Sequence, residues 1–261
     1  MSSAGPLAGK VIAVTRPRRQ AESLAHLIEA AGGTPLLAPL LEIAPPDDAA
    51  PLRQAAERLN DFALAVFISP NAVDYSLPAI LAHGPWPAGV RPAAVGQGTV
   101  RALAARGIEH CIAPTERFDS EALLELPALS AAEVCGRRVV IFRGDGGREL
   151  LAETLRSRGA EVEAVTCYRR FAPPGGFDAL IAACREGRLD ALTISSSEGL
   201  HYLMDGLDDA ARRLLTPIAV FVPHARILET ARSLGFRHTF LTAPADTGFV
   251  AGLCVYNWHS S

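Results

Sequence analysis

The feature that most constrains the fold is a set of six short apolar segments, each followed by a stretch with helical periodicity. They are rich in Val and Ile and alternate little with polar residues: VIAVT, LAVFI, RPAAV, RVVIF, LDALTI and IAVFV. Such runs are typical of parallel strands that are buried on both faces of a sheet. After the first run, Leu24, Leu27, Ile28 and Ala31 fall on one face of a predicted helix. Alternating strands and helices predict a doubly wound α/β fold.

These strand–helix units occur twice along the chain. Three pairs of similar segments are separated by the same number of residues, so that Gly9 corresponds to Gly136, Ser69 to Ser196, and Asp119 to Asp246. A fourth pair, Ala93–Glu109 and Ala219–Phe236, departs by a residue or two. We expect the two aspartates to be N-caps of their helices. A structural repeat in a chain of 261 residues predicts two α/β domains.

The strongest chain breakers indicate where the two domains meet in the sequence. They are Pro45–Pro46 and Pro173–Gly176, and each follows the first strand–helix–strand unit of its half. If the chain crosses between domains at these points, both crossings join a discontinuous domain to an inserted one. A simple cut near Ala131 is the alternative, and the residues alone leave both arrangements open.

Composition excludes several classes of protein. A net charge of −3 provides no general basic field for nucleic acid. No apolar run reaches the ~18 residues of a membrane span, and the first ten residues lack the apolar region of a secretory signal. The five cysteines show no C-x-x-C spacing and the seven histidines no H-E-x-x-H pattern. We therefore expect reduced core thiols, a cytoplasmic protein and no structural metal.

The loops after the predicted strands carry small, hydroxyl-bearing, glycine or arginine residues. In doubly wound sheets, ligands bind beyond the carboxyl ends of the strands. Each loop precedes a helix whose free N–H groups and positive dipole end attract anions, and arginine adds bidentate contacts. The loops are TRPRR (15–19), SPNAV (69–73), GQGT (96–99), RGDGGR (143–148), SSSEG (195–199) and PHAR (223–226). They predict a large polyanionic ligand held by many modest contacts.

Each of these features also has a purely structural interpretation. Ser69 and Ser196, each taken alone, are better explained as helix caps. RGDGGR lacks the phosphate-loop pattern, and the G-x-G at Gly96 lacks the third glycine of a dinucleotide site. The absence of a G-x-S-x-G elbow gives no support to Ser-His-Asp hydrolysis. Arg169 and Arg170 are equally well explained as solvated surface residues.

The same segments resemble the uroporphyrinogen-III synthase family. The similarity runs from about Gly9 to Trp258, in order and spacing, through VTRP, FISPNAV, AVGQGT, FRGDGGRELLAETLRSRGAEVEAVTCYRR, SSSEGL, FVPHARILETARSLGF and YNW. The resemblance implies two doubly wound parallel-sheet (flavodoxin-like) domains that are joined by a two-strand linker, with the active-site cleft between them. It favours the discontinuous arrangement, with residues 1–39 and 172–261 in one domain and residues 40–171 in the inserted one.

The resemblance also implies an activity. The family converts hydroxymethylbilane, a linear tetrapyrrole with eight carboxylates, into uroporphyrinogen III with loss of water and inversion of ring D, without a metal or an organic cofactor. We therefore expect a cyclising hydro-lyase of haem biosynthesis, active as a cytoplasmic monomer without nucleic-acid or membrane partners. The alternative is a non-catalytic two-domain module that binds a linear tetrapyrrole or another polycarboxylate.

Finally, the resemblance implies particular site residues. Tyr168 in CYRR matches a cleft-facing tyrosine that is proposed as the acid assisting departure of the hydroxyl group; the alternative is that it only positions substrate or packs in the linker. The implied substrate-binding residues are Thr15, Arg16, Ser69, Asn71, Gly96, Thr99, Arg143, Arg148, Ser196 and Ser197. Many members have a Gly-Pro-Thr-Thr-like loop where this chain has PHAR, so we expect His224 or Arg226 to replace its hydroxyl contact.

Overall fold

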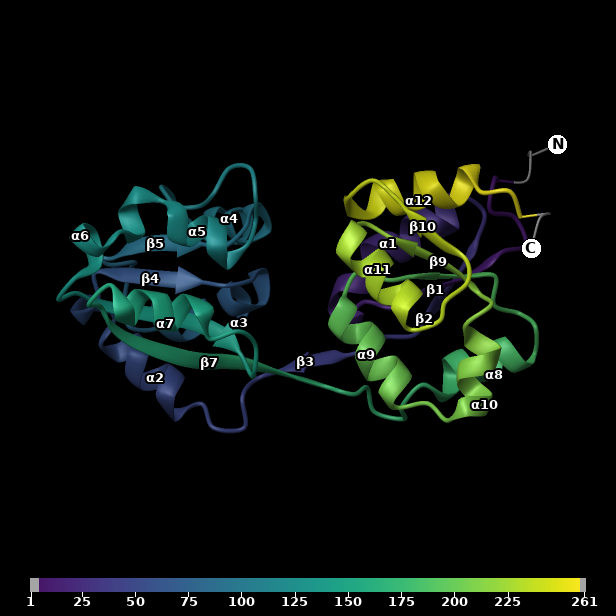
Figure 1. The fold of residues 1–261 in the computed structure, drawn as a ribbon, viewed down its shortest axis with the longest axis horizontal. Helices are drawn as coiled ribbons and strands as arrows, with labels where there is room; N and C mark the ends of the chain where they lie inside the picture. The colour runs from purple at the N-terminus through teal and green to yellow at the C-terminus, as the bar shows by residue number, and fades with distance from the viewer. Residues whose placement is uncertain (1–4, 259–261) are drawn as a thin grey trace. The chain divides into compact units, whose positions relative to one another are not determined.

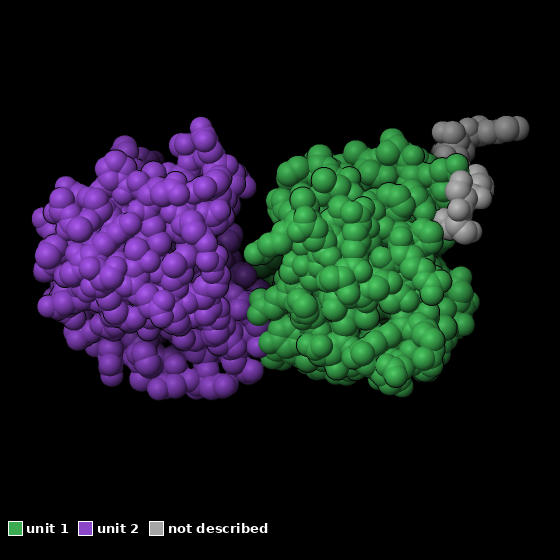
Figure 2. Space-filling view, viewed as in Figure 1, with its two compact units in different colours: residues 1–42, 171–261 green, residues 43–170 purple. Residues whose placement is uncertain are grey.

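The computed structural model describes residues 5–258, which form two compact units (Figure 2). Unit 1 comprises the described residues up to Glu42 and those from Phe171 onward, and unit 2 comprises Ile43–Arg170. The chain passes from one unit to the other at strands β3 (Glu42–Ala44) and β7 (Glu161–Phe171). Residues 1–4 and 259–261 of the predicted discontinuous domain lie outside the described residues.

Unit 1 is built on a five-stranded sheet in the order β10-β9-β8-β1-β2, and its registered strand pairs are parallel. The strands are β1 (Val11–Val14), β2 (Thr34–Leu37), β8 (Ala191–Thr193), β9 (Ala219–Val222) and β10 (Thr239–Leu241). Counted along this unit, the order is 2-1-3-4-5, which is the flavodoxin-like order. The strand order reverses between β1 and β8, where the loops of a doubly wound sheet diverge. The predicted doubly wound α/β class with parallel sheets is confirmed.

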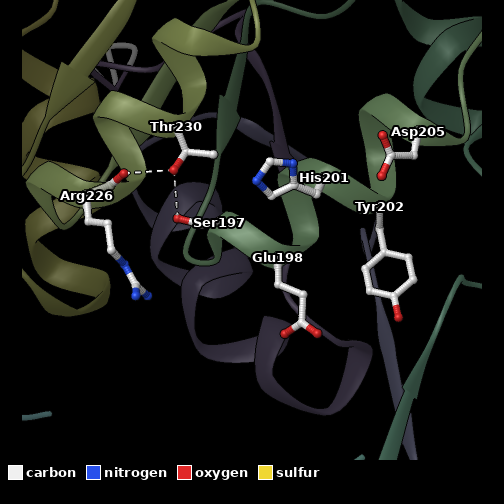
Figure 3. A pocket seen from close by; sticks show the side chains of 7 residues that line it. All are labelled: Ser197, Glu198, His201, Tyr202, Asp205, Arg226 and Thr230. Carbon is white, nitrogen blue, oxygen red and sulfur yellow. Dashed lines mark hydrogen bonds between the residues drawn. The ribbon is translucent and has the colours of Figure 1, made fainter. Parts of the chain in front are cut away.

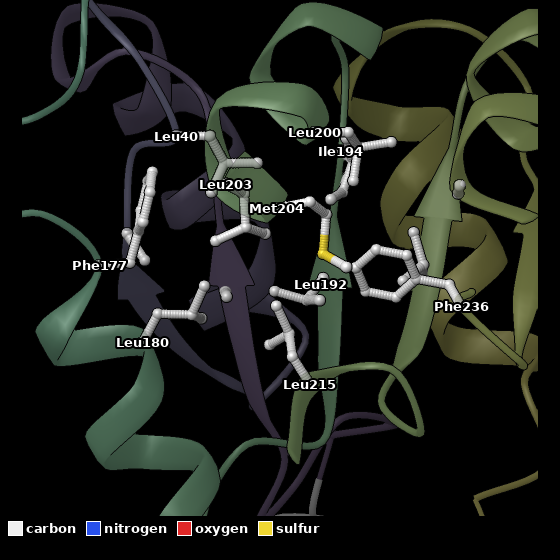
Figure 4. Close-up of a cluster of buried hydrophobic side chains, with 14 of the residues drawn as sticks. Leu40, Phe177, Leu180, Leu192, Ile194, Leu200, Leu203, Met204, Leu215 and Phe236 are labelled. Atoms are coloured by element: carbon white, nitrogen blue, oxygen red, sulfur yellow. The ribbon is translucent and has the colours of Figure 1, made fainter. Parts of the chain in front are cut away.

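Helices cover both faces of this sheet because successive strand residues point to opposite sides. Ile12 and Val14 pack with residues of α1 and α12, whereas Ala13 packs with residues of α8–α11. Figure 1 shows these helices around the sheet of unit 1. Figure 4 shows the second face, where Leu192 of β8 lies among Leu203 and Met204 of α9. The helices are α1 (Arg18–Ala30), α8 (Asp178–Arg185), α9 (Ser197–Asp205), α10 (Asp209–Leu215), α11 (Ala225–Ser233) and α12 (Ala245–Val255).

Unit 2 repeats this arrangement with four parallel strands and the short strand β3 at one edge. Its sheet order is β3-β7-β6-β4-β5, and β7, β6, β4 and β5 pair in parallel. The remaining strands are β4 (Leu64–Phe67), β5 (Arg91–Ala94) and β6 (Arg138–Gly144). One face packs on α2 (Ala50–Glu57), α3 (Pro70–Leu81) and α4 (Gln97–Ala104), and the other on α5 (Ser120–Glu125), α6 (Ala131–Val134) and α7 (Leu150–Ser157). Two short 3₁₀ helices, η1 (Leu59–Asp61) and η2 (Pro127–Leu129), complete the unit.

The two aspartates that were expected to cap helices behave differently. Asp119 is the N-cap of α5, where its carboxylate accepts from the Ala122 N–H at 2.7 Å. The same prediction is wrong for Asp246, because α12 starts one residue before it and Pro244 occupies the N-cap position. Asp246 therefore lies in the first turn of α12, where a negative charge still interacts favourably with the helix dipole.

The cysteines are free thiols. The prediction that they are core residues is wrong for Cys135, which is exposed. Burial raises the pKa of Cys111 and of Cys167 to about 12 and that of Cys184 to about 11. These three thiols stay protonated at neutral pH and are therefore poor nucleophiles. None of the helices in residues 5–258 combines the length and the apolar character that crossing a membrane requires.

Candidate active site

In each unit, the residues predicted from the sequence lie at or near the carboxyl edge of the sheet. In unit 1 they follow β1, β8 and β9: Thr15, Arg16, Ser196, Ser197, His224 and Arg226. In unit 2 they follow β4 and β5, or belong to β6, its following loop and β7: Ser69, Asn71, Gly96, Thr99, Arg143, Arg148 and Tyr168. The strands are parallel, so the residues after them gather at one edge within each unit.

Thr15 uses its hydroxyl inside the sheet of unit 1. Its side chain is 4% exposed, and the hydroxyl donates to the Thr193 carbonyl at 2.6 Å. The Thr193 hydroxyl donates in turn to the Ala13 carbonyl at 3.0 Å. This exchange ties β1 to β8 at the point where the strand order reverses. A ligand at Thr15 therefore meets backbone groups rather than its hydroxyl.

Arg16 is held by a carboxylate of the protein itself. Its guanidinium pairs with Asp246 in the first turn of α12 and lies over the Phe249 ring, 5.4 Å from the centroid. Both partners of the ion pair are mostly buried, with side chains 18% and 19% exposed. Arg16 is thus oriented at the carboxyl edge, and a ligand carboxylate has to compete with Asp246 for it.

A pocket of about 430 Å³ lies between α9 and α11 in unit 1 (Figure 3). It brings Ser197 and Arg226 together, because Thr230 forms hydrogen bonds with the Ser197 hydroxyl at 3.1 Å and with the Arg226 carbonyl at 2.9 Å. The other residues that line it are Glu198, which belongs to the predicted SSSEG loop, Tyr202, which was expected to be a core residue, and His201, Asp205 and Thr230, which the sequence analysis did not single out. The pocket contains donors and an arginine beside two carboxylates.

Two further predicted residues of unit 1 mark the starts of these helices. Ser196 is the N-cap of α9, and its hydroxyl oxygen accepts from the Gly199 N–H at 3.2 Å. His224 is the N-cap of α11, but its exposed side chain makes no capping hydrogen bond. The imidazole of His224 is therefore not used by its own helix.

The two arginines of the RGDGGR loop have different surroundings in unit 2. The Arg143 side chain is 12% exposed and donates to Glu149 at 2.6 Å and to the Gly146 and Gly147 carbonyls, so it holds the loop together. Arg148 is 67% exposed and pairs with Glu121. The hydrogen bond from Arg148 lowers the pKa of the Glu121 carboxyl. Exposed ion pairs contribute little free energy, so Arg148 can exchange Glu121 for a ligand carboxylate.

The loop after β5 offers backbone rather than side-chain groups. Gly96 is the N-cap of α4, and a Cβ placed there would lie 3.4 Å from the Cβ of Phe118, an exposed residue. The Thr99 side chain is 2% exposed and therefore shielded from a ligand. Asn71, the second residue of α3, is half-buried.

Tyr168 belongs to a buried cluster in unit 2. Its side chain is 1% exposed. Its hydroxyl is 3.1 Å from the Ser69 hydroxyl and accepts a hydrogen bond from the Arg170 guanidinium at 3.0 Å. Ser69 is also the N-cap of α3, where it accepts from the Ala72 N–H at 3.1 Å. The structure thus brings Tyr168 and Ser69, two of the predicted residues, into direct contact.

Gly144 makes the contact between Tyr168 and Ser69 sterically feasible. Tyr168 belongs to β7 and Ser69 follows β4, and β6 lies between these strands in the sheet. Gly144 is the register partner of Tyr168 at the end of β6. A Cβ at Gly144 would lie 2.6 Å from two ring carbons of Tyr168 and 3.0 Å from its hydroxyl. Without that Cβ, the tyrosine ring crosses β6 and reaches the end of β4.

Asp145 fixes Arg170 beside the Tyr168 hydroxyl. Its carboxylate accepts from the Arg170 N–H at 2.9 Å, and its carbonyl accepts from the Arg170 guanidinium at 3.2 Å. Its own N–H donates to the Tyr168 carbonyl at 2.9 Å. Sequence reasoning included Gly144 and Asp145 only as members of the RGDGGR loop and explained Arg170 as a surface residue, so it missed the role of all three. The available signal was the strand period, which places Tyr168 and Arg170 on the same face of β7.

The described residues contain no group of three or more His, Cys, Asp or Glu side chains that could hold a metal ion. The predicted site residues in this part of the chain offer mainly hydroxyl groups, arginines and backbone N–H groups, beside the carboxylates and histidines described above. Such groups bind carboxylates and move protons between oxygen atoms.

Comparison with known proteins is consistent across sequence and structure. A family model described as uroporphyrinogen-III synthase HemD matches residues 22–247. The uroporphyrinogen-III synthase of Salmonella typhimurium is 32% identical over 239 residues, covering 90% of this chain and 96% of the relative. That of Synechococcus elongatus is 32% identical over 234 residues, covering 85% and 86%.

Two solved structures have the same fold. A mutant uroporphyrinogen III synthase from Thermus thermophilus matches with a TM-score of 0.65 and 21% identity over 93% of this chain and 96% of that chain. A uroporphyrinogen-III synthetase from Helicobacter pylori matches with a TM-score of 0.54 and 10% identity over 93% of this chain and 97% of that chain. At these identities the structural matches establish the fold alone.

Proposed function

Because this chain belongs to the uroporphyrinogen-III synthase family, we propose that its carboxyl-edge residues are the machinery of that enzyme. The chain converts hydroxymethylbilane into uroporphyrinogen III in haem biosynthesis, with loss of water, closure of the macrocycle and inversion of ring D. The reaction needs a proton for the departing hydroxyl group and a set of contacts that hold a flexible, eight-fold negatively charged substrate.

We propose that the substrate carboxylates bind to helix N-termini and arginines at the carboxyl edges. In support, α3, α4, α9 and α11 all start at these edges, and free N–H groups at helix starts bind anions. Thr15 and Thr99 contribute through their backbones, because their hydroxyls are buried. The proposed substrate-binding residues are Thr15, Arg16, Ser69, Asn71, Gly96, Thr99, Arg143, Arg148, Ser196, Ser197, His224 and Arg226.

Tyr168 is proposed as the source of the proton. The observation that supports this is the 3.1 Å contact between its hydroxyl and Ser69 at the end of β4. Protonation lets the hydroxyl group of the substrate leave as water, and the pyrrole nitrogen stabilises the cation that remains. Ring D then attacks through its substituted carbon to give the spiro intermediate, which fragments and recloses. For those later steps the protein supplies orientation, which favours attack at one carbon over simple closure.

The proposal extends to the cellular context. The chain acts as a monomer in the cytoplasm, without an organic cofactor and without nucleic-acid or membrane partners. In support, the net charge is −3, and the described cysteines are free. A non-catalytic tetrapyrrole-binding module is the competing function, and the assay of the reaction product distinguishes it from the enzyme.

Isomer analysis tests the proposed function. The purified chain is incubated with freshly prepared hydroxymethylbilane, the products are oxidised to porphyrins, and the type I and type III isomers are separated. We expect the type III isomer to dominate, because unassisted closure gives type I. Type I alone would refute the enzyme, and tight binding of substrate without a change in the isomer ratio would identify the module.

Arg226→Met tests the pocket in unit 1. Arg226 is exposed at the rim beside Ser197, and exposed ion pairs are worth ~0.2–1 kcal/mol. We therefore expect KM to rise by up to about fivefold with kcat nearly unchanged. Arg213→Met is the matched control, because Arg213 is an exposed arginine on α10 outside this pocket. Equal KM values for the two variants would remove Arg226 from the binding site.

A further inference from the structure

We propose that Ser69 is the group that hands the proton to the substrate, and that Arg170, held by Asp145, sets the direction of the hydrogen bonds that lead to it. The inference rests on the proposed function and deepens it, because it names the donor that touches the substrate. In this proton relay, the buried Tyr168 is the source of the proton, and Ser69 donates it to the substrate.

The donor of each hydrogen bond in this series can be assigned by starting from Arg170. A guanidinium group has N–H donors and no acceptor, so the 3.0 Å contact between Arg170 and Tyr168 has the arginine as donor. One lone pair of the phenol oxygen is therefore occupied by a positive group. What remains to be assigned is whether Tyr168 donates to Ser69 or accepts from it, since the 3.1 Å distance fits both.

Burial decides between the two assignments. If Ser69 donated to Tyr168, the phenol hydrogen would need another acceptor, and none is found for it among residues 5–258. A buried donor without an acceptor carries a substantial free-energy cost. If Tyr168 donates to Ser69 instead, every polar atom of the buried phenol is satisfied. The favoured arrangement is therefore Arg170 to Tyr168 to Ser69.

In this arrangement the hydroxyl hydrogen of Ser69 remains available for donation to a ligand. Its oxygen accepts from the Ala72 N–H at 3.1 Å and from Tyr168, which occupies both lone pairs. Its own hydroxyl hydrogen therefore points away from both partners. Ser69 is half-buried at the carboxyl edge, whereas Tyr168 is 1% exposed. Of the two hydroxyls, Ser69 is the one that a ligand at this edge can reach.

Several contacts hold the guanidinium of Arg170 beside the Tyr168 hydroxyl. Asp145 binds both its backbone N–H and its guanidinium, at 2.9 Å and 3.2 Å. The guanidinium also lies over the tyrosine ring, 5.2 Å from the centroid. A fixed positive charge at this point stabilises the tyrosinate that forms when the proton leaves. Arg170 is thus a positioning residue that acts through Tyr168.

The proposed step conserves protons and electrons. The Ser69 O–H donates its proton to the hydroxyl oxygen of the substrate as the carbon–oxygen bond breaks, and the bonding pair leaves with water. Ser69 takes the phenol proton at the same time, so Tyr168 becomes a tyrosinate beside Arg170. When the last ring closes, the carbon that forms the new bond releases a proton, which returns through Ser69 to Tyr168. The net loss is one water.

A double-mutant cycle tests whether Ser69 and Tyr168 act in series. General acid catalysis contributes about 10²–10⁴-fold, so we expect Ser69→Ala and Tyr168→Phe each to lower kcat by about 10² or more. The double variant should be no slower than the slower single variant. Asp208→Ala is the control for the lost helix cap, because Asp208 caps α10 in the same way; it should keep the kcat of the original protein. If the kcat losses of the two single variants multiply in the double variant, or if the kcat of Ser69→Ala is within about threefold of the original, the proton relay is overturned.

Arg170 is tested by a split between kcat and KM and by rescue. Arg170→Met should lower kcat at least about tenfold with KM within about threefold, and Arg170→Lys, which keeps a charged donor, should recover part of that loss. Arg169→Met is the matched control, because Arg169 is the neighbouring arginine and pairs with Asp47 at 3.0 Å. A merely structural role for Arg170 predicts no rescue by lysine, and that result would overturn its part in the relay.

The isomer assay distinguishes a failure of the proton relay from a failure of the proposed function. If the unmodified chain forms no type III isomer, the proposed function fails and the inference fails with it. If the unmodified chain forms type III isomer and Ser69→Ala does so equally fast, only the relay fails. Both results come from the same isomer assay on the full chain.

Discussion

Tyr168→Phe is expected to lower kcat for type III formation by about 10²-fold or more while KM changes by less than about threefold. The phenyl ring fills the same space over Gly144, so packing is kept and only the hydroxyl is lost. Ser69 then has no internal proton source, and Arg170 loses an acceptor. Removing a general acid of this kind costs about 10²–10⁴-fold. Initial rates and isomer ratios measured across a range of substrate concentrations give both constants.

Tyr75→Phe is the matched control for this experiment. Tyr75 lies in the same unit, with its ring centroid 6.0 Å from that of Tyr168, and its hydroxyl donates to the Ile43 carbonyl at 3.0 Å. It makes no contact with Ser69 or Arg170 among the hydrogen bonds of the described residues. We expect its turnover to stay near that of the original protein. Type III formation at the original rate in Tyr168→Phe would remove the acid role of Tyr168 without affecting family membership.

Gly144→Ala is the second change with a large expected effect. The added methyl group would lie 2.6 Å from two carbons of the Tyr168 ring and 3.0 Å from its hydroxyl, so the ring has to move. Overpacking of this kind costs ~1–3 kcal/mol of stability. Displacement of the ring breaks the contact with Ser69, and we expect kcat to fall by about as much as in Tyr168→Phe. Denaturant unfolding measures the first effect, and the isomer assay measures the second.

Gly89→Ala separates the steric effect from the general effect of replacing a glycine. A Cβ at Gly89 meets no atom within 4 Å, so both stability and kcat should be retained. If Gly144→Ala is folded and has the original kcat, the phenol does not need its observed position. Loss of kcat in Gly144→Ala with normal binding of substrate would support the argument that Gly144 admits the ring.

The general architecture could be predicted from the sequence because its signals are local. Uninterrupted runs such as Val11–Val14 identified parallel strands, and the helix that follows buries Leu24 and Ile28 as its periodicity predicted. The capping roles of Ser69 and Ser196 are also local, and both are observed. Structural features that depend only on one strand and the loop after it can be predicted from that segment of the sequence alone.

The arrangement around Tyr168 was not predictable in the same way because it depends on strand order. Arg170 was equally well explained as a surface residue, since nothing local ties it to Asp145 of the preceding strand–loop unit. The role of Gly144 emerges only when β6 is known to lie between β7 and β4. The burial of Thr15 and Thr99 is likewise a result of packing. The expected N-cap role of Asp246 failed because helix starts are defined to within a residue or two by sequence alone.

Arg16 and Arg148 meet carboxylates of the chain itself, Asp246 and Glu121. A substrate that takes over these arginines exchanges one ion pair for another instead of forming a new one. Dissolved salt weakens the resting pair and the replacing pair together. The affinity for this many-charged substrate should therefore depend less steeply on ionic strength than its charge alone implies. When the product dissociates, the displaced carboxylates pair with the two arginines again and so compete with the product for them.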